Sequence, residues 1–188
     1  MSSAHFDQLM EKLDANRELV GILGLGYVGL PLAVTFAKHG VRVLGFEKSR
    51  EKLAKLQAGE NYIADVEDAD LKSVLTDGAF SVTGDFTRIA DCDAVIICVP
   101  TPLDRFKKPD MSYIQSACEE IGKHMKPGTL VALESTTYPT TTEEFMLPIL
   151  ERTSGMKHGD GFWLVYSPER VDPGNKIYKT ENTPKVVG

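Results

Sequence analysis

The stretch Leu19-Val-Gly-Ile-Leu-Gly24-Leu-Gly26-Tyr-Val-Gly29 decides the fold of this 188-residue chain. Its first five residues form an apolar run typical of a buried strand, and a helical pattern begins where the glycines end. A strand, a Gly-x-Gly-x-x-Gly turn and a helix in this order are typical of a dinucleotide-binding fold. Gly24 permits the tight turn, Gly26 lets the backbone approach a pyrophosphate, and Gly29 lets the helix pack closely on the strand.

Outward from this stretch, apolar strand-like runs alternate with helical patterns, which is typical of a parallel sheet. We expect strands at 19–23, 41–46, 80–83, 94–99, 129–133 and 162–166, and helices at 28–39, 50–58, 113–124 and 142–152. An acidic insert at 64–76 adds one or two helices and is expected to modify the rim of a site. The strands are almost continuously apolar, so helices should cover both faces. The sequence therefore predicts an α/β fold with a Rossmann-like, doubly wound parallel sheet and flanking helices.

The composition excludes several classes of protein. The net charge is −6 and no run of lysine or arginine occurs, so no nucleic-acid partner is expected. No membrane segment and no secretory signal are present, so we expect a cytoplasmic protein. The three cysteines Cys92, Cys98 and Cys118 have no metal-ligand spacing, and we expect no metal site. A short amphipathic helix in residues 1–17 should precede the nucleotide-binding domain, which is predicted at 18–188.

Glu47 stands at the end of the second expected strand, twenty-one residues after Gly26. An acidic side chain at this place accepts hydrogen bonds from the adenosine ribose and repels the 2′-phosphate of NADP. The cofactor predicted from the residues is therefore NAD, although Lys48, Arg50 and Lys52 lie close enough in sequence to accept a 2′-phosphate. The alternative is that Glu47 only caps the helix that starts near Ser49.

Ligands of a doubly wound sheet bind at the carboxyl ends of the strands, and three of these ends carry unusual residues. Pro100-Thr101-Pro102 is a stiff turn that offers the Thr101 hydroxyl, or else simply a rigid loop. A hydroxyl-rich turn follows the fifth strand, from Ser135 to Thr142. Helix capping explains much of it, but Thr136 lies nearer the strand end than a cap needs and is a candidate for orienting a water or a nicotinamide, with Ser135 beside it as a cofactor-binding candidate.

The third strand end carries Ser167-Pro168-Glu169-Arg170, where a carboxylate and a guanidinium are adjacent in sequence. Glu169 is either a proton-transfer group or half of an exposed charged pair. The residues alone leave both interpretations open.

Taken together and in order, six motifs resemble the UDP-glucose/GDP-mannose dehydrogenase family: GLGYVGLPLAVTFAKHG, GFEKSREKLAKLQAGE, ICVPTPL, ESTTYPTTTEE, SPERVDPGN and NTPKVVG. The resemblance implies an oxidation of a sugar C6 alcohol to a carboxylate with two NAD. The wording of the motifs is similar to that of enzymes acting on UDP-N-acetylhexosamines, namely UDP-N-acetylglucosamine or UDP-N-acetylmannosamine. By motif position, the resemblance places Tyr27, Val28, Glu47, Lys52, Thr101 and Thr136 at the NAD site.

The resemblance also implies catalytic roles for Thr136 and Glu169, which would position a water and assist proton transfer in thioester hydrolysis. The family's cysteine nucleophile, lysine and asparagine belong to a central helix and a C-terminal UDP-sugar domain that this sequence lacks. We therefore expect the chain alone to bind NAD without turnover, and the full-length protein to be a homo-oligomer. Two alternatives are a stand-alone NAD-binding module and the domain of a one-step hydroxyacid dehydrogenase, which would not predict the STTYP and SPER stretches.

Overall fold

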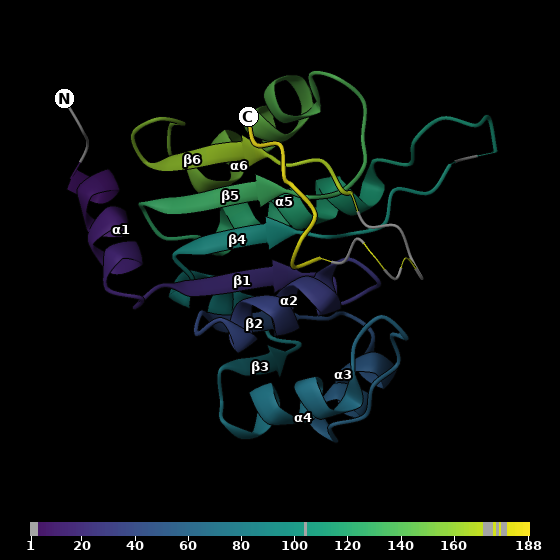
Figure 1. Cartoon of the computed structure of the whole chain (residues 1–188). Helices are drawn as coiled ribbons and strands as arrows, with labels where there is room; N and C mark the ends of the chain where they lie inside the picture. Colours follow the sequence, from purple (N-terminus) through teal and green to yellow (C-terminus); the bar gives the residue numbers. More distant parts are fainter. Residues whose placement is uncertain (1–3, 104, 171–174, 176, 178–179) are drawn as a thin grey trace.

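The computed structural model describes residues 4–103, 105–170, 175, 177 and 180–188. Its six strands form one parallel sheet in the order β3-β2-β1-β4-β5-β6 (Figure 1). This is the doubly wound order, with the chain reversing direction across the sheet between β1 and β4. The predicted fold class is confirmed. The strands are β1 (Leu19–Leu23), β2 (Arg42–Phe46), β3 (Phe80–Thr83), β4 (Ala94–Ile97), β5 (Thr129–Leu133) and β6 (Phe162–Tyr166).

Helices cover both faces of the sheet, so each face has its own apolar core. The helices are α1 (Ala4–Asp14), α2 (Gly29–Lys38), α3 (Arg50–Gln57), α4 (Asp68–Thr76), α5 (Ser112–His124) and α6 (Leu147–Ser154). Residues of α2, α3 and α4 pack with Ile22 and Phe80 on one face. Residues of α5 and α6 pack with Val95 and Phe162 on the other. The strands are apolar throughout because both of their faces are covered.

Some element boundaries differ from the predicted ones. β4 ends at Ile97, two residues earlier than expected, so Cys98 and Val99 already belong to the loop after it. The helix expected at 142–152 is divided into a π-helical turn, η2 (Thr141–Met146), and α6. Pro148 lies in the first turn of α6, and its missing N–H cannot continue a helical hydrogen-bond pattern from the preceding residues. The acidic insert contains one helix, α4, and an unexpected 3₁₀ helix, η1 (Phe86–Asp91), begins at the Asp85 cap.

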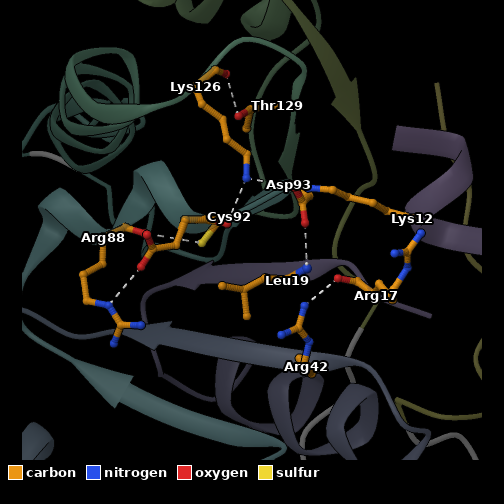
Figure 2. A network of polar contacts seen from close by, with 10 residues as sticks. Lys12, Arg17, Leu19, Arg42, Arg88, Cys92, Asp93, Lys126 and Thr129 are labelled. Atoms are coloured by element: carbon orange, nitrogen blue, oxygen red, sulfur yellow. Dashed lines mark hydrogen bonds and ion pairs between the residues drawn. The ribbon is translucent and has the colours of Figure 1, made fainter. Parts of the chain in front are cut away.

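Asp93 joins α1 to the amino ends of the strands (Figure 2). Its Oδ1 accepts hydrogen bonds from Lys12 Nζ at 2.6 Å and pairs with Lys126 Nζ at 2.9 Å, while Oδ2 accepts the Leu19 N–H at 3.0 Å. Burial by itself raises the pKa of the Asp93 carboxyl, but the hydrogen bonds from these partners outweigh it and hold the pKa below its usual value. The N-terminal helix is therefore anchored at the amino ends of the strands, opposite their carboxyl ends.

The last described residues return to the far edge of the sheet. Gly188 N–H donates to the Tyr166 carbonyl at 3.0 Å, and Tyr166 N–H donates to the Gly188 carbonyl at 2.8 Å. On its way this segment, yellow in Figure 1, passes the carboxyl ends of the strands. It thereby brings Lys185 to Glu134, the residue directly after β5. Among the described residues, no helix is both long and apolar enough to cross a membrane.

Candidate functional site

A cavity of about 710 Å³ opens at the carboxyl ends of the strands, where the connections from β1 and β4 diverge. Ligand sites of doubly wound sheets lie at this place. The structure brings most of the predicted site residues together in its wall: Gly24, Gly26, Tyr27, Val28, Glu47, Lys52, Pro100, Thr101, Ser135, Thr136 and Glu169. Gly29 lies behind the wall, in the first turn of α2.

The three glycines of the turn meet different surroundings. Gly24 has φ +91°, and a Cβ there would lie 2.8 Å from the Cys98 carbonyl oxygen. A Cβ on Gly29 would lie 2.0 Å from the Gly24 carbonyl oxygen. A Cβ on Gly26 would meet nothing within 4 Å. Gly24 and Gly29 are thus required by the packing of the turn itself, whereas Gly26 borders open space that a pyrophosphate can approach.

The start of α2 offers hydrogen-bond donors to that open space. Its N-cap residue Val28 has no side-chain cap, and the backbone N–H groups of residues 26–29 have no acceptor among the described residues. The unpaired N–H groups and the helix dipole together favour an anion. The residues present fit the diphosphate of a dinucleotide.

Glu47 lies on the β2 side of the glycine turn. Its Oε1 accepts the Ser49 N–H at 2.8 Å, and its Oε2 lies 3.4 Å from the Leu25 nitrogen. The N-cap of α3 is Ser49, whose hydroxyl accepts the Lys52 N–H, so Glu47 is not the cap residue. These bonds hold a half-buried carboxylate in the cavity wall on the β2 side of the glycine turn.

The cavity wall also contains Lys48, which the sequence offered only as a possible 2′-phosphate contact, and several residues that were not predicted from the sequence. Lys48 Nζ donates to the Ser116 hydroxyl at 2.8 Å and lies 5.5 Å above the Phe86 ring, so it bridges the end of β2 and helix α5. Phe86 comes from the unexpected 3₁₀ helix. The other unpredicted lining residues are Leu23, Leu25, Phe46, Cys98, Val99, Ser112, Tyr113, Ala117 and Glu134. Sequence reasoning missed these residues because they come from separate elements that meet only in the folded chain.

Tyr62, just before the acidic insert, supports the glycine turn. The Tyr62 hydroxyl donates to the Leu25 carbonyl at 2.7 Å, and Lys52 Nζ lies 5.6 Å from the centre of its ring. Burial and the Glu47 charge raise the pKa of the Tyr62 phenol, so it stays protonated and remains a donor. None of residues 64–76 lines the cavity, so the expected role of the insert at the rim of the site stays a prediction.

On the other side of the glycine turn, two hydrogen bonds join the loops after β4 and β5. The Thr101 hydroxyl donates to the Thr136 carbonyl at 2.8 Å, and the Ser135 hydroxyl donates to the Val99 carbonyl at 2.7 Å. Farther along the hydroxyl-rich turn, Thr137 and Thr141 bond to each other at 2.8 Å. The turn thus has two parts: Ser135 and Thr136 face the cavity, and the later threonines stabilise the start of η2.

Two carboxylates stand in this part of the wall. Glu169 follows β6 and is half-buried, and its Oε1 accepts the Arg170 N–H at 2.7 Å. Arg170 itself is exposed, and the next four residues of the SPERVDPGN motif lie outside the described residues. Glu134 is 6% exposed and is ion-paired with Lys185. Glu134 was not predicted as a site residue because it directly follows the apolar run of the fifth strand in the sequence.

None of the three cysteines has the surroundings of a nucleophile. All are buried, and burial raises the pKa of Cys92 and Cys118 to about 12 each and raises that of Cys98 as well. A thiol of this kind carries almost no thiolate at neutral pH. Among the described residues, no three histidine, cysteine or acidic side chains are close enough to hold a metal ion.

Residues 18–188 match the model of the UDP-glucose/GDP-mannose dehydrogenase family, NAD binding domain. The chain belongs to this family. The resemblance in the sequence is confirmed, and the cofactor of the domain is NAD.

Relatives of known activity show how much of such a protein this chain represents. A UDP-N-acetyl-D-glucosamine 6-dehydrogenase of Pseudomonas aeruginosa is 41% identical over 167 residues, which are 89% of this chain and 39% of that protein. A UDP-N-acetyl-D-mannosamine dehydrogenase of Pyrococcus horikoshii is 37% identical and covers 90% of this chain and 40% of its own length. The solved NDP-N-acetyl-D-galactosaminuronic acid dehydrogenase of Methanosarcina mazei has a TM-score of 0.88 and 36% identity, over 100% of this chain and 41% of its own. The chain thus spans about two fifths of these relatives.

Proposed function

We propose that the cavity binds one NAD molecule across the glycine turn. The observation that supports this best is that Glu47, the glycine turn and the loops after β4 and β5 line one cavity, in that order across the sheet. The pyrophosphate would lie on the N–H groups beside Gly26, and the adenosine ribose on Glu47, with Tyr27, Val28 and Lys52 at the rim. The nicotinamide riboside would lie toward Pro100, Thr101, Ser135 and Thr136.

NAD is the proposed cofactor in preference to NADP. The Glu47 carboxylate would accept hydrogen bonds from the ribose hydroxyls and repel a 2′-phosphate. The nearby cations do not change this expectation, because Lys48 is bonded to Ser116 and Lys52 lies against the Tyr62 ring. Both lysines are therefore already held by other groups.

In the full-length protein, we propose oxidation of the C6 alcohol of a UDP-sugar, a UDP-N-acetylhexosamine, to the uronic acid with two NAD. The support is the family and the activity that the relatives' names state. NAD accepts a hydride when it is bound. Thr136 and Glu169 line the same end of the cavity, where a hydroxyl can orient a water and a carboxylate can accept its proton. Because the three thiols are buried, the cysteine nucleophile that the family resemblance implies would come from a part of the protein outside this sequence.

The proposed organisation is an N-terminal helical extension, 1–17, followed by the NAD-binding domain, 18–188. The remainder of the protein would supply the UDP-sugar contacts and the contacts of a homo-oligomer. The three free, buried thiols fit a reducing compartment, and we propose a cytoplasmic location.

Calorimetric titration of the 188-residue chain with NAD, NADP and UDP-N-acetylglucosamine tests the proposal, with Glu47→Ala as the variant. We expect NAD to bind better than NADP, the preference to be lost in Glu47→Ala, and the UDP-sugar to bind weakly if at all. The matched control is Glu60→Ala, an exposed acid away from the cavity. A folded wild-type chain that binds no NAD would contradict the proposal. The alternative, a stand-alone NAD-binding module, would be supported by a relative that binds NAD and has no sugar-binding domain.

A further inference from the structure

Glu134 is a charged side chain built into the wall of the cavity. It follows β5 directly, its N–H donates to the Ile97 carbonyl at 2.9 Å, and its side chain is 8% exposed. Oε2 accepts a hydrogen bond from Lys185 Nζ, 51 positions away. Among the described residues this is the one hydrogen-bond partner of the Glu134 side chain, which leaves Oε1 as an acceptor in the wall.

Lys185 approaches Glu134 from outside the cavity. It lines a small neighbouring hollow together with Val28, Leu32, Glu169 and Arg170. The lysine therefore bonds the carboxylate from behind, while the carboxylate itself lines the main cavity. A buried carboxylate needs such a partner, because without one it would draw in water or a proton.

The position across the sheet determines which part of a dinucleotide Glu134 would meet. Glu47 lies on the β2 side of the glycine turn, and Glu134 lies beyond β4, on the opposite side. With the adenosine ribose on Glu47, the nicotinamide riboside extends toward β5. The carboxamide of nicotinamide has two N–H donors and one carbonyl acceptor, so a fixed carboxylate can bond only its N–H side.

We propose that Glu134 is the positioning residue for the nicotinamide ring: its Oε1 accepts a carboxamide N–H, and Lys185 holds the carboxylate in place. The inference rests on the proposed NAD site. A hydrogen bond at one side of the carboxamide selects one orientation of the ring and hence the face that is presented to a hydride donor. The bond to an ionised acceptor is also among the stronger kinds.

The test compares NAD with ADP-ribose, which keeps the adenosine and the pyrophosphate but lacks nicotinamide. We expect Glu134→Gln to weaken NAD binding by about tenfold, because a charged acceptor is replaced by an amide whose oxygen Lys185 already claims. ADP-ribose binding should stay within about twofold of wild type. Lys185→Met should shift NAD affinity in the same direction. The matched control is Glu143→Gln, an exposed acid at the start of η2 that is not in the cavity wall.

A second ligand makes the test specific for the N–H group. The 3-acetylpyridine analogue of NAD has a methyl ketone in place of the carboxamide and so cannot donate. It should bind the wild-type chain about as weakly as NAD binds Glu134→Gln, and that variant should lose no further affinity for it.

Three results would overturn the inference. Equal losses for NAD and ADP-ribose would mean that Glu134 only supports the fold of the wall, and an unchanged NAD affinity would mean that it does not meet the ring. If Glu134→Gln lost as much affinity for the 3-acetylpyridine analogue as for NAD, Glu134 would not bond the carboxamide N–H. A folded wild-type chain that binds neither NAD nor ADP-ribose would overturn the proposed function itself, and this differs from a change confined to the variant.

Discussion

At the scale of single residues, the glycine turn separates a binding requirement from a packing requirement. Gly26 and Gly29 belong to one motif, but a Cβ on the first would enter open space and a Cβ on the second would strike the Gly24 carbonyl. Gly24 needs its positive φ as well. The two kinds of glycine can therefore be told apart by experiment.

Gly26→Ala should fold normally and lose its ligand. The unfolding free energy should change by no more than about 1 kcal/mol, since the added methyl meets no protein atom and φ is not positive. NAD affinity should fall by at least about tenfold, because the methyl would occupy the space of the pyrophosphate. Urea denaturation and calorimetry measure the two effects, and a variant that binds NAD like wild type would contradict the proposed place of the pyrophosphate.

Gly29→Ala should affect stability instead: its free energy of unfolding should be lower than that of the wild-type chain. The Cβ would lie 2.0 Å from the Gly24 carbonyl oxygen and 3.1 Å from Cys98 Cβ, so either the turn or α2 must move. Overpacking of this kind costs about 1–3 kcal/mol. Urea denaturation measures it, and an unchanged midpoint would show that the helix can shift without cost.

At the scale of elements, α1 depends on one carboxylate. Asp93 connects Lys12 of α1, Lys126 before β5 and the first N–H of β1. A second contact is aromatic: the Phe6 ring of α1 lies 5.8 Å from Trp163 of β6. Trp163 is the one tryptophan in the sequence, so its fluorescence reports directly on the docking of α1.

Asp93→Asn should destabilise the chain by about 1–2 kcal/mol, because hydrogen bonds to an ionised acceptor become bonds to a neutral one. The value is modest since the two lysine side chains are 41% and 33% exposed and partly solvated. The neighbouring Asp91→Asn is the matched control: its pair with Arg88 is on the surface, and we expect a change within about 0.5 kcal/mol. Urea denaturation followed by Trp163 fluorescence compares the two variants. Equal effects would show that Asp93 contributes no more to stability than a carboxylate of a surface ion pair.

The same carboxylate predicts a pH dependence. The pKa of Asp93 is lowered in the folded chain, so its contribution to stability is fully present above the unfolded pKa of about 4 and is lost as the pH falls through the folded value. The difference in unfolding free energy between wild type and Asp93→Asn should therefore be constant from about pH 7 to pH 5 and shrink below about pH 4. A difference that grows on acidification would contradict the lowered pKa.

At the scale of the whole molecule, the three thiols are protected by the two apolar cores, Cys92 and Cys118 in one and Cys98 in the other. Cys92 follows η1, Cys98 follows β4 and Cys118 lies in α5, and all are buried. A thiol-specific disulfide reagent should therefore react with none of them quickly in the native chain and with all three after unfolding in guanidinium. Cys98 lines the cavity, so NAD should slow its reaction further. One thiol that reacts at once in the folded chain would show a local opening that the packing does not indicate.

Features that depend on a few neighbouring residues could be predicted from the sequence, whereas features that depend on distant contacts could not. The strands and the glycine turn follow from periodicity and glycine placement within a few residues, and they were predicted closely. The division of the 142–152 helix was missed although Pro148 stands in the interior of that range, where a proline without an N–H interrupts the helical hydrogen bonds; in the structure it lies in the first turn of α6 instead. Phe86 and Ser116 were missed because each is unremarkable in its own segment, and the contacts of Lys48 with both of them depend on the folded chain.

By itself, the sequence determined the parallel sheet, the dinucleotide turn, the acid after the second strand and the family, since each is written in short contiguous patterns. Only the tertiary structure decided which group each lysine meets: Lys12 bonds Asp93 across 81 positions, Lys48 bonds Ser116 across 68, and Lys185 bonds Glu134 across 51. The physical reason is that a charged residue in a sequence looks like solvated surface, and its partner depends on where the folded chain brings a second group within hydrogen-bond distance.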